Sequence, residues 1–469
     1  MVPEESRRTK IEPGMRCLVV GLGVSGFAAV RFLERAGARV AVSDGARPEA
    51  VLAEIRQWLQ KHDIPWESGG HQSDWFTEAQ LVVVSPGVPL TLPALERSRR
   101  AGIPIVGELG LGARYLDIPV VAVTGTNGKS TVTELLGEIF LAAGKKVFVG
   151  GNLGTPLCAY LLGNDVADLV VLEVSSYQLD TAPDFKPQAA VLLNITPDHL
   201  DRYRDFNHYA ASKMSIFAAQ GPGDFAVING DDPEIEARVK TSSGHGKFCR
   251  FGEKAGGSCR ALIASDEITL YGAGEPEIYS LAGHQLRAAP NLGNAAAAIL
   301  TARLMGCDQA AVKKGLDDFR ALAHRLEKVT EADGVQYVDD SKATNVGAVV
   351  AALSGQNRPV ILIAGGRDKR GGYQPLVPLV REKVKAMVLI GEASEVMDQV
   401  FRGVTRVIRA GSMEEAVFLA RELAESGDVV LLSPACASFD MFTDYKHRGR
   451  LFQEVVLTQS VGMRAGGEG

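Results

Sequence analysis

A glycine-rich segment with one lysine carries the clearest chemistry in this sequence. Residues 125–131 read Gly-Thr-Asn-Gly-Lys-Ser-Thr, between the apolar run 119–123 and a segment with a helical pattern. In such a loop backbone N–H groups approach phosphate oxygens, the helix N-terminus adds a positive dipole, the lysine adds a point charge and the serine hydroxyl reaches Mg²⁺. Val123 stands where the usual spacing has glycine, so this is the shorter Gly-x-x-Gly-Lys-Ser form. An ordinary turn is the alternative, but the flanking elements favour a nucleoside triphosphate site.

Two other polar side chains come at the ends of apolar runs. Glu173 lies near the end of the run 168–174, and His199 follows the run 188–194. Ligands of open parallel sheets gather beyond the carboxyl ends of the strands, so Glu173 is placed to coordinate Mg²⁺ beside the triphosphate. His199 would reach the same rim. A capping acid and an ordinary satisfied histidine are the alternatives.

A second glycine-rich turn lies near the N-terminus. Residues 21–26 read Gly-Leu-Gly-Val-Ser-Gly after the apolar run 16–20, and Asp44 follows the next run. This order is typical of a dinucleotide fingerprint, in which a pyrophosphate sits on a helix N-terminus and the acid lies near a ribose or base. The same geometry suits any nucleoside diphosphate, and a tight strand-to-helix turn is the structural alternative.

Composition narrows the class of protein. The chain has 469 residues, of which 46% are hydrophobic and 23% charged, so we expect a soluble enzyme of several domains. Its net charge of −6 disfavours a nucleic-acid partner. No apolar run approaches the roughly 18 residues of a membrane-spanning helix, which predicts no membrane insertion and a cytoplasmic location. The six cysteines show no Cys-x-x-Cys pair, so neither a disulfide framework nor a zinc site is expected.

The alternation of apolar runs with helical patterns predicts three α/β domains in series, with boundaries near Gly107 and Ala321. The Gly- and Ser-rich stretch 241–274 is predicted to be a peripheral β extension, and two helices are predicted at 295–305 and 414–425. The predicted strands are 16–20, 39–43, 80–84, 103–106, 119–123, 168–174, 188–194, 225–229, 336–338, 360–364, 386–390, 405–409 and 429–432.

Several longer motifs together resemble one family. The chain is similar to the peptidoglycan Mur ligases from about Arg16 to its C-terminus. The segments 340–345 and 433–438 are similar to members that add D-glutamate, rather than alanine, a diamino acid or a dipeptide. The motifs, in order, are Gly-Thr-Asn-Gly-Lys-Ser-Thr at 125–131, Glu-Val-Ser-Ser at 173–176, Asp-His-Leu-Asp at 198–201, His-Arg at 324–325, Asp-Ser-Lys-Ala-Thr-Asn at 340–345 and Ser-Pro-Ala-Cys-Ala-Ser-Phe-Asp at 433–440.

The resemblance implies an architecture and a reaction. It implies a Rossmann-like N-terminal domain (1–107) that holds a UDP-sugar, a central P-loop ATPase-type domain (108–321) with a parallel sheet, and a Rossmann-like C-terminal domain (322–469) that closes on the site. The implied substrates are ATP, D-glutamate and UDP-N-acetylmuramoyl-L-alanine. ATP phosphorylates the carboxylate of the UDP-sugar substrate, the amine of D-glutamate attacks the acyl phosphate, and phosphate leaves. We expect a monomer.

The resemblance also implies two Mg²⁺ sites, one near Ser130 and Glu173 and one between His199 and Lys213. A lysine ammonium has no lone pair for a metal. In the family the equivalent lysine is carbamylated by CO₂, which converts a cation into a carboxylate-like ligand. A solvated helix lysine is the alternative for Lys213.

Other roles carry over residue by residue. The expected catalytic residues are Lys129, Glu173, His199, Lys213 and Lys342. The expected ATP contacts are Thr126, Asn127, Gly128, Lys129, Ser130, Thr131, Val132, Asn294, Arg325 and Asp340. The expected UDP-substrate contacts are Ser25, Gly26, Asp44, Gly87 and Asn152. The expected D-glutamate contacts are Lys342, Thr344, Lys369, Ser438 and Tyr445.

This sequence departs from the family pattern at three places. Pro290 stands where relatives commonly have histidine, Tyr445 where they often have phenylalanine, and Gly45 with Ala46 replaces a more polar pair, for which Arg47 is a possible substitute. The rival hypotheses are another ligase of the same superfamily, such as a different Mur step or folylpolyglutamate synthetase, and a nucleotide-binding dehydrogenase or sensor. The dehydrogenase or sensor hypothesis predicts tight NAD binding and no need for ATP.

Overall fold

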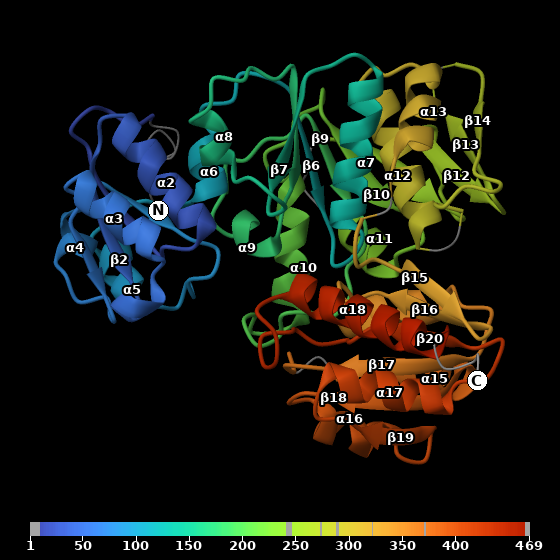
Figure 1. Ribbon diagram of the computed structural model, residues 1–469. Helices are drawn as coiled ribbons and strands as arrows, with labels where there is room; N and C mark the ends of the chain where they lie inside the picture. Colours follow the sequence, from blue (N-terminus) through green and yellow to red (C-terminus); the bar gives the residue numbers. More distant parts are fainter. Residues whose placement is uncertain are drawn as a thin grey trace.

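The protein folds into three α/β domains, each built on its own sheet (Figure 1). The computed structural model describes residues 10–240, 246–272, 274–287, 290–320, 322–369 and 372–464. The three sheets confirm the predicted fold class. The boundaries at residues 107 and 321 stay predictions, and residue 321 lies outside the described ranges. Among the described residues, no helix combines the length and the apolar character needed to cross a membrane.

The N-terminal domain has a fully parallel sheet in the order β3-β2-β1-β4-β5, the doubly wound order of Rossmann folds. Alternate β1 residues face opposite cores, with Val19 against α2 and α3, and Leu18 against α4 and α5. Its strands are β1 (Arg16–Val20), β2 (Arg39–Asp44), β3 (Trp66–Ser68), β4 (Leu81–Val84) and β5 (Ile105–Gly107). Its helices are α2 (Val24–Arg35), α3 (Ala53–Lys61), α4 (Trp75–Glu78) and α5 (Pro93–Arg100), with a 3₁₀ turn at Pro48–Ala50.

The central sheet has nine strands in the order β14-β13-β12-β11-β10-β9-β6-β8-β7. Its pairs are parallel from β7 to β12 and antiparallel from β12 to β14, so the predicted peripheral extension continues the main sheet. Its strands are β6 (Val120–Thr124), β7 (Val147–Gly151), β8 (Leu169–Glu173), β9 (Ala189–Leu192), β10 (Phe225–Asn229), β11 (Lys247–Gly252), β12 (Arg260–Ala264), β13 (Glu267–Tyr271) and β14 (Glu277–Ser280).

Helices cover both faces of the central sheet, so its parallel strands are apolar on both sides. Val121 and Val123 of β6 share a core with α7, α12 and α13, whereas Val120 and Ala122 share one with α9 and α10. The helices are α6 (Glu108–Ala113), α7 (Lys129–Ala142), α8 (Leu157–Leu161), α9 (Ser176–Leu179), α10 (Phe206–Met214), α11 (Pro233–Val239), α12 (Asn291–Leu304) and α13 (Gln309–Asp318), with a 3₁₀ turn at Ser215–Phe217.

The C-terminal sheet has the order β15-β16-β20-β17-β18-β19 and is parallel except for the edge strand β15. In Figure 1 this domain lies below the central domain, with α18 running beside β15 and β16. Its strands are β15 (Glu327–Ala332), β16 (Val335–Asp339), β17 (Val360–Gly365), β18 (Val384–Ile390), β19 (Arg406–Arg409) and β20 (Val429–Leu432). Its helices are α14 (Val346–Ser354), α15 (Val377–Lys383), α16 (Ser394–Phe401), α17 (Met413–Leu423) and α18 (Tyr445–Arg464), with a 3₁₀ turn at Gln374–Leu376.

One cysteine pair corrects an expectation from the sequence. Cys249 on β11 and Cys259 beside β12 form a disulfide, with their Cα atoms 4.9 Å apart. We expected no disulfide, because spacing in the sequence does not show that these residues meet on neighbouring strands. Cys17, Cys158, Cys307 and Cys436 are free and buried, as expected.

A buried carboxyl lies at the junction between the N-terminal and central domains. Glu108 is the first residue of α6 and is 1% exposed. Its Oε1 accepts a hydrogen bond of 2.5 Å from the backbone N–H of Cys158, and its Oε2 has no partner. Burial raises the pKa of Glu108 to about 7, although the bonds from Cys158 oppose the shift. The folded protein therefore favours the neutral carboxylic acid.

The Glu108→Gln variant should change how stability depends on pH. Between the ordinary carboxyl value of 4.5 and about 7, the folded state holds a proton that the unfolded state has lost, so wild-type stability falls as pH rises. The amide cannot ionise, so the variant should lack this fall, which is at most about 3 kcal/mol. Urea unfolding at pH 5 and pH 8 measures the change in the free energy of unfolding between the two pH values. The exposed Glu54→Gln is the control. Parallel pH profiles of wild type and Glu108→Gln would contradict the assignment.

Candidate functional site

The glycine-rich loop joins β6 to α7, as the sequence predicted. Gly125 and Gly128 have φ values of 154° and 86°, which glycine adopts without strain. A Cβ on Gly128 would lie 2.4 Å from Oδ1 of Asn294, so the loop also needs glycine for close approach. Lys129 begins α7, and the loop N–H groups and the helix dipole therefore face one place, as phosphate binding requires.

This loop forms one wall of a cavity of about 410 Å³ between the central and C-terminal domains. The central domain contributes the loop and the ends of β8 and β9, and the C-terminal domain contributes the segment before α14. Among the residues that line the cavity are Thr126, Asn127, Gly128, Lys129, Ser130, Thr131, Asn152, Glu173, His199, Asn294, Arg325, Asp340, Lys342, Thr344 and Lys369. The structure thus brings most predicted ATP, metal and amino-acid contacts to one site.

Glu173 ends β8 with a carboxylate that is 3% exposed. Asn152 Nδ2 donates to its Oε1 over 2.6 Å, whereas its buried Oε2 has no hydrogen-bond partner. Burial alone would raise the pKa of Glu173, but Lys129, the polar groups of Ser130 and Asn152, and Lys342 together lower it. An ionised carboxylate with one unpartnered oxygen in a cavity suits a cation.

His199 lines the cavity and Lys213 lies beneath the glycine-rich loop, and burial shifts the pKa of both side chains toward their neutral forms. His199 has a left-handed φ of 56°, and burial lowers its pKa to about 4, so its imidazole is neutral and has a free lone pair near pH 7. Lys213 on α10 is 2% exposed, and its Nζ donates to the Gly125 carbonyl over 2.8 Å. Burial, together with Lys129, lowers the pKa of Lys213 well below its usual value, which favours the uncharged amine.

Two cations at the cavity contact the glycine-rich loop itself. Lys129 Nζ donates to the carbonyls of Gly125 and Thr126, each over 2.9 Å. Arg325 Nη2 donates to Ser130 Oγ over 3.1 Å, from the C-terminal to the central domain. Burial lowers the pKa of both cations. Their neutral partners are weaker acceptors than phosphate oxygens, which can therefore replace them.

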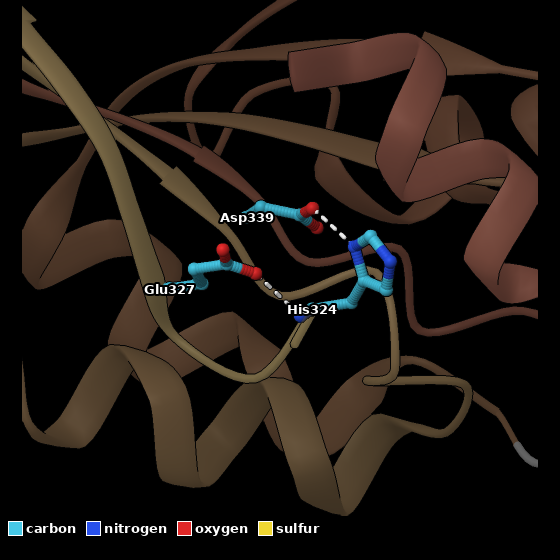
Figure 2. Close-up of side chains that lie close together, drawn as sticks. All are labelled: His324, Glu327 and Asp339. Carbon is cyan, nitrogen blue, oxygen red and sulfur yellow. Dashed lines mark hydrogen bonds and ion pairs between the residues drawn. The ribbon is translucent and has the colours of Figure 1, made fainter. Parts of the chain in front are cut away.

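Arg325 is held by a fixed turn. Its neighbours His324 and Leu326 both have left-handed φ values, 63° and 46°. Figure 2 shows the contacts that hold this turn in place. His324 Nδ1 lies 2.7 Å from Asp339 Oδ2, and the His324 backbone N–H donates to the Glu327 carboxylate. Gln453 Nε2 donates to both acids, so the cluster is satisfied within the protein although its spacing would also suit a metal.

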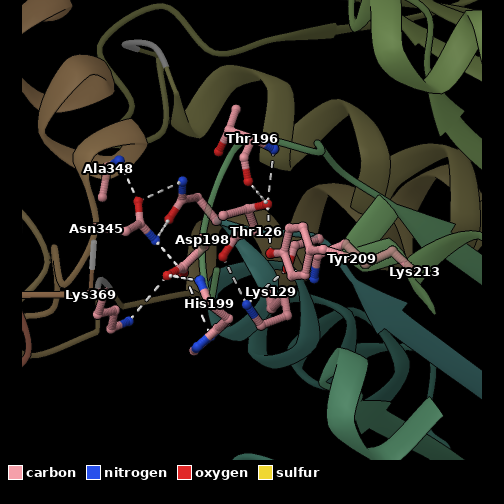
Figure 3. Close-up of polar contacts among 12 residues, drawn as sticks. Thr126, Lys129, Thr196, Asp198, His199, Tyr209, Lys213, Asn345, Ala348 and Lys369 are labelled. Atoms are coloured by element: carbon pink, nitrogen blue, oxygen red, sulfur yellow. Dashed lines mark hydrogen bonds and ion pairs between the residues drawn. The ribbon is translucent and has the colours of Figure 1, made fainter. Parts of the chain in front are cut away.

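A polar network closes the domain junction (Figure 3). The side-chain amides of Asn127 and Asn345 exchange hydrogen bonds of 3.0 and 3.3 Å between the domains. Asn345 Nδ2 also donates to Asp198 Oδ2 over 3.1 Å, and Lys369 Nζ donates to Asp198 Oδ1 over 3.3 Å. Asn345 in addition caps α14 through the Ala348 N–H. Asn127, Asp198, Asn345 and Lys369 form what we call the junction latch.

Some predicted residues lie outside the cavity. Ser25 and Gly26 lie in the first turn of α2, Asp44 ends β2, and Gly87 lies in the turn after β4, all in the N-terminal domain. Asp44 accepts from the Leu22 and Ala46 N–H groups. Ser438 and Tyr445 do not line the cavity, but the Tyr445 ring centroid lies 3.9 Å from Lys342 Nζ. Val132 is fully buried in α7, and Lys213 lies under the loop. The ligand roles of all these residues stay predictions.

Sequence reasoning assigned no role to Asp198 or Asn345. Asp198 is 6% exposed, and Lys369, His199 and the His199 N–H lower its pKa against the effect of burial, so it is ionised. The one available signal was position: Asp198 follows a strand end beside His199, and Asn345 is a cap-forming residue directly before a helix.

Family models match all three domains. Residues 15–107 match the Mur ligase MurD-like N-terminal domain, 123–302 the Mur ligase middle domain, and 324–436 the Mur ligase glutamate ligase domain. The chain is 46% identical over 447 residues to the UDP-N-acetylmuramoylalanine–D-glutamate ligase of Desulfotalea psychrophila, covering 95% of this chain and 97% of that protein.

This chain belongs to the Mur ligase family. The equally named protein of Desulfosudis oleivorans is 44% identical over 469 residues, the full length of both chains. The fold also matches a pseudomurein peptide ligase type C from Methanothermus fervidus, with a TM-score of 0.60 at 19% identity, covering 95% of this chain and 100% of that one. Membership makes the chain an ATP-dependent ligase and confirms the resemblance seen in the motifs.

The junction latch gives a testable expectation for Asn345→Ser. Serine retains an acceptor for the Ala348 N–H, and so the α14 cap, but it removes the amide that bonds Asn127 and Asp198. Loss of these bonds should weaken closure and lower kcat/KM about tenfold, with little effect on thermal stability. Steady-state kinetics measure kcat/KM, and X-ray scattering measures how far the domains close. The exposed Asn357→Ser is the control. An unchanged kcat/KM would show that the latch does not support turnover.

Proposed function

We propose that this chain joins D-glutamate to UDP-N-acetylmuramoyl-L-alanine through an acyl phosphate formed with ATP. The observation that carries the proposal is the shared cavity, in which a phosphate-binding loop faces the unpartnered oxygen of Glu173 and two lysines of the other domain, Lys342 and Lys369. The names of the full-length relatives supply the two organic substrates.

The reaction sets a carboxylate against a triphosphate, so the principal catalytic need is positive charge fixed in place before reaction. Lys129 and Arg325 would exchange their carbonyl and hydroxyl partners for phosphate oxygens without further rearrangement of the loop. Lys342, whose pKa burial and Arg325 lower to about 8, remains largely protonated at neutral pH and would face the transferred phosphoryl group. These groups would stabilise the charge that develops as ADP leaves.

The donor set fits two Mg²⁺ ions. Ser130 and Glu173 would hold one, because the hydroxyl and the unpartnered Oε2 are hard oxygen ligands. His199 and Lys213 would hold the second, the lysine as its carbamate. Bound Mg²⁺ would neutralise phosphate charge and polarise the phosphoryl oxygens. The neutral amine favoured at Lys213 is the form that reacts with CO₂, which supports this assignment.

The remaining contacts divide among the substrates. Asn294 and Asp340 would hold the nucleoside of ATP, with Asp340 kept in place by Ser433 Oγ over 2.9 Å. Lys342, Thr344, Lys369, Ser438 and Tyr445 would hold D-glutamate, whose two carboxylates suit charge-assisted hydrogen bonds.

After the carboxylate oxygen of the UDP-sugar substrate has taken the γ-phosphoryl group, the uncharged amine of D-glutamate attacks the acyl carbon. The C–N bond forms, the C–O bond to phosphate breaks, and the amine loses a proton. Ser25, Gly26, Asp44, Gly87 and Asn152 would hold the UDP-sugar. We expect the enzyme to act as a monomer in the cytoplasm.

Phosphate release tests the proposal directly. With ATP, UDP-N-acetylmuramoyl-L-alanine and D-glutamate all present, release should be at least about a hundredfold faster than with either organic substrate omitted. Without the UDP-sugar substrate the γ-phosphoryl group has no carboxylate to accept it, and without D-glutamate the acyl phosphate has no amine to displace phosphate. The rival ligase hypotheses are tested with alternative substrates. These are L-alanine, meso-diaminopimelate and D-alanyl-D-alanine for the other Mur steps, and L-glutamate with a folate for folylpolyglutamate synthetase. Release that needs neither organic substrate, or that prefers one of the alternatives, contradicts the proposal. Tight NAD binding without ATP use would favour the dehydrogenase hypothesis.

The Lys213→Ala variant should lose most activity, about a hundredfold or more, because it lacks the carbamate ligand. A small carboxylate such as acetate or formate should partly restore turnover by supplying the missing oxygens. The exposed Lys254→Ala is the control and should behave as wild type. Near-normal turnover of Lys213→Ala, with no response to the additive, would remove the carbamate assignment.

A further inference from the structure

A fully buried arginine connects the two loops that carry the expected amino-acid contacts. Arg448 lies in the first turn of α18 and is 0% exposed. Its Nε donates to Ser341 Oγ over 3.0 Å and its Nη2 to the Ser341 carbonyl over 2.8 Å. Its Nη1 donates to the Cys436 carbonyl over 3.1 Å. One guanidinium thus joins the segment before α14 to the segment after β20.

The joined residues lie next to the expected ligands. Ser341 directly precedes Lys342, and Cys436 lies two residues before Ser438. The loops also meet directly, through the Ala435 N–H and the Ala343 carbonyl at 2.9 Å. Ser341 Oγ donates to the Tyr445 carbonyl over 2.8 Å, so the start of α18 holds both the loop and the aromatic ring beneath Lys342.

The backbone at Gly366 packs closely against the guanidinium of Arg448. A Cβ on Gly366 would lie 3.2 Å from Arg448 Nη1 and 2.3 Å from the Ala437 carbonyl, so the backbone approaches the guanidinium closely. Burial lowers the pKa of Arg448 to about 10, with Cys436, Asp440, Asp339 and Asp340 opposing the shift, so the group stays charged near pH 7. Its three acceptors, the Ser341 hydroxyl and the carbonyls of Ser341 and Cys436, are neutral oxygens.

We propose that Arg448 is a positioning residue for the dicarboxylate amino acid: by tying Ser341 to Cys436 it sets the spacing between Lys342 and Ser438. A lysine at this place would keep the charge but could not bond both loops, because it lacks the planar fork. The inference rests on the proposed function, since it assumes that these loops bind D-glutamate.

The test is a set of Michaelis constants for Arg448→Lys, with exposed Arg450→Lys on the same helix as control. Arg448→Lys should raise the KM for D-glutamate about tenfold, because charge-assisted bonds to one loop are lost, and leave the KM for ATP within about twofold. Ser341→Ala, which removes one acceptor and leaves the guanidinium, should raise the same constant about threefold.

A folded Arg448→Lys with unchanged KM for D-glutamate overturns the proposal, as does an equal rise in the constants for all three substrates. If Arg448→Lys does not fold, Ser341→Ala decides by the same criteria. Failure of the proposed function is distinguishable, because wild-type phosphate release would then not depend on D-glutamate at all.

Discussion

The structure depends on one electrostatic constraint: basic side chains are buried around the phosphate-binding loop before any anion arrives. Lys129 and Arg325 use loop carbonyls and a serine hydroxyl as partners, and Lys342 lies above an aromatic ring. Glu173, Asp198 and Asp340 offer carboxylates nearby, and burial raises the pKa of Asp340 to about 7. Because the cations are already desolvated and fixed, they can bind phosphate and carboxylate oxygens with little reorganisation.

Two domains supply these charges, so their junction is part of the site. The Asn127–Asn345 pair, the Lys369–Asp198 ion pair and the Arg325–Ser130 bond all cross it. Asn345 is also the N-cap of α14. The same side chain therefore fixes the start of this helix and hydrogen-bonds Asn127 of the glycine-rich loop. The site is therefore complete only where the two domains contact each other, an arrangement that couples domain movement to catalysis in many enzymes.

The sequence predicted the residues that follow strands of a parallel sheet, because strand ends meet at one edge whatever the length of the crossovers. Glu173 and His199 were found in this way, and the three sheets followed from their apolar runs. The sequence did not predict the partners across domains: Asn345 lies 218 residues from Asn127, and Arg448 lies 107 residues from Ser341. The strands β3 and β7, the antiparallel edge β15 and the Cys249–Cys259 bridge depend on neighbours that local patterns do not identify.

The central claim is that the cavity forces a substrate carboxylate against the γ-phosphate of ATP. Oxygen transfer tests it most directly. Both carboxylate oxygens of UDP-N-acetylmuramoyl-L-alanine are labelled with ¹⁸O, and the released phosphate is analysed by mass spectrometry after turnover with D-glutamate. Attack of that carboxylate on phosphorus predicts one labelled oxygen in every phosphate released. Unlabelled phosphate, with one labelled oxygen in the amide product and the other lost to water, would contradict the account.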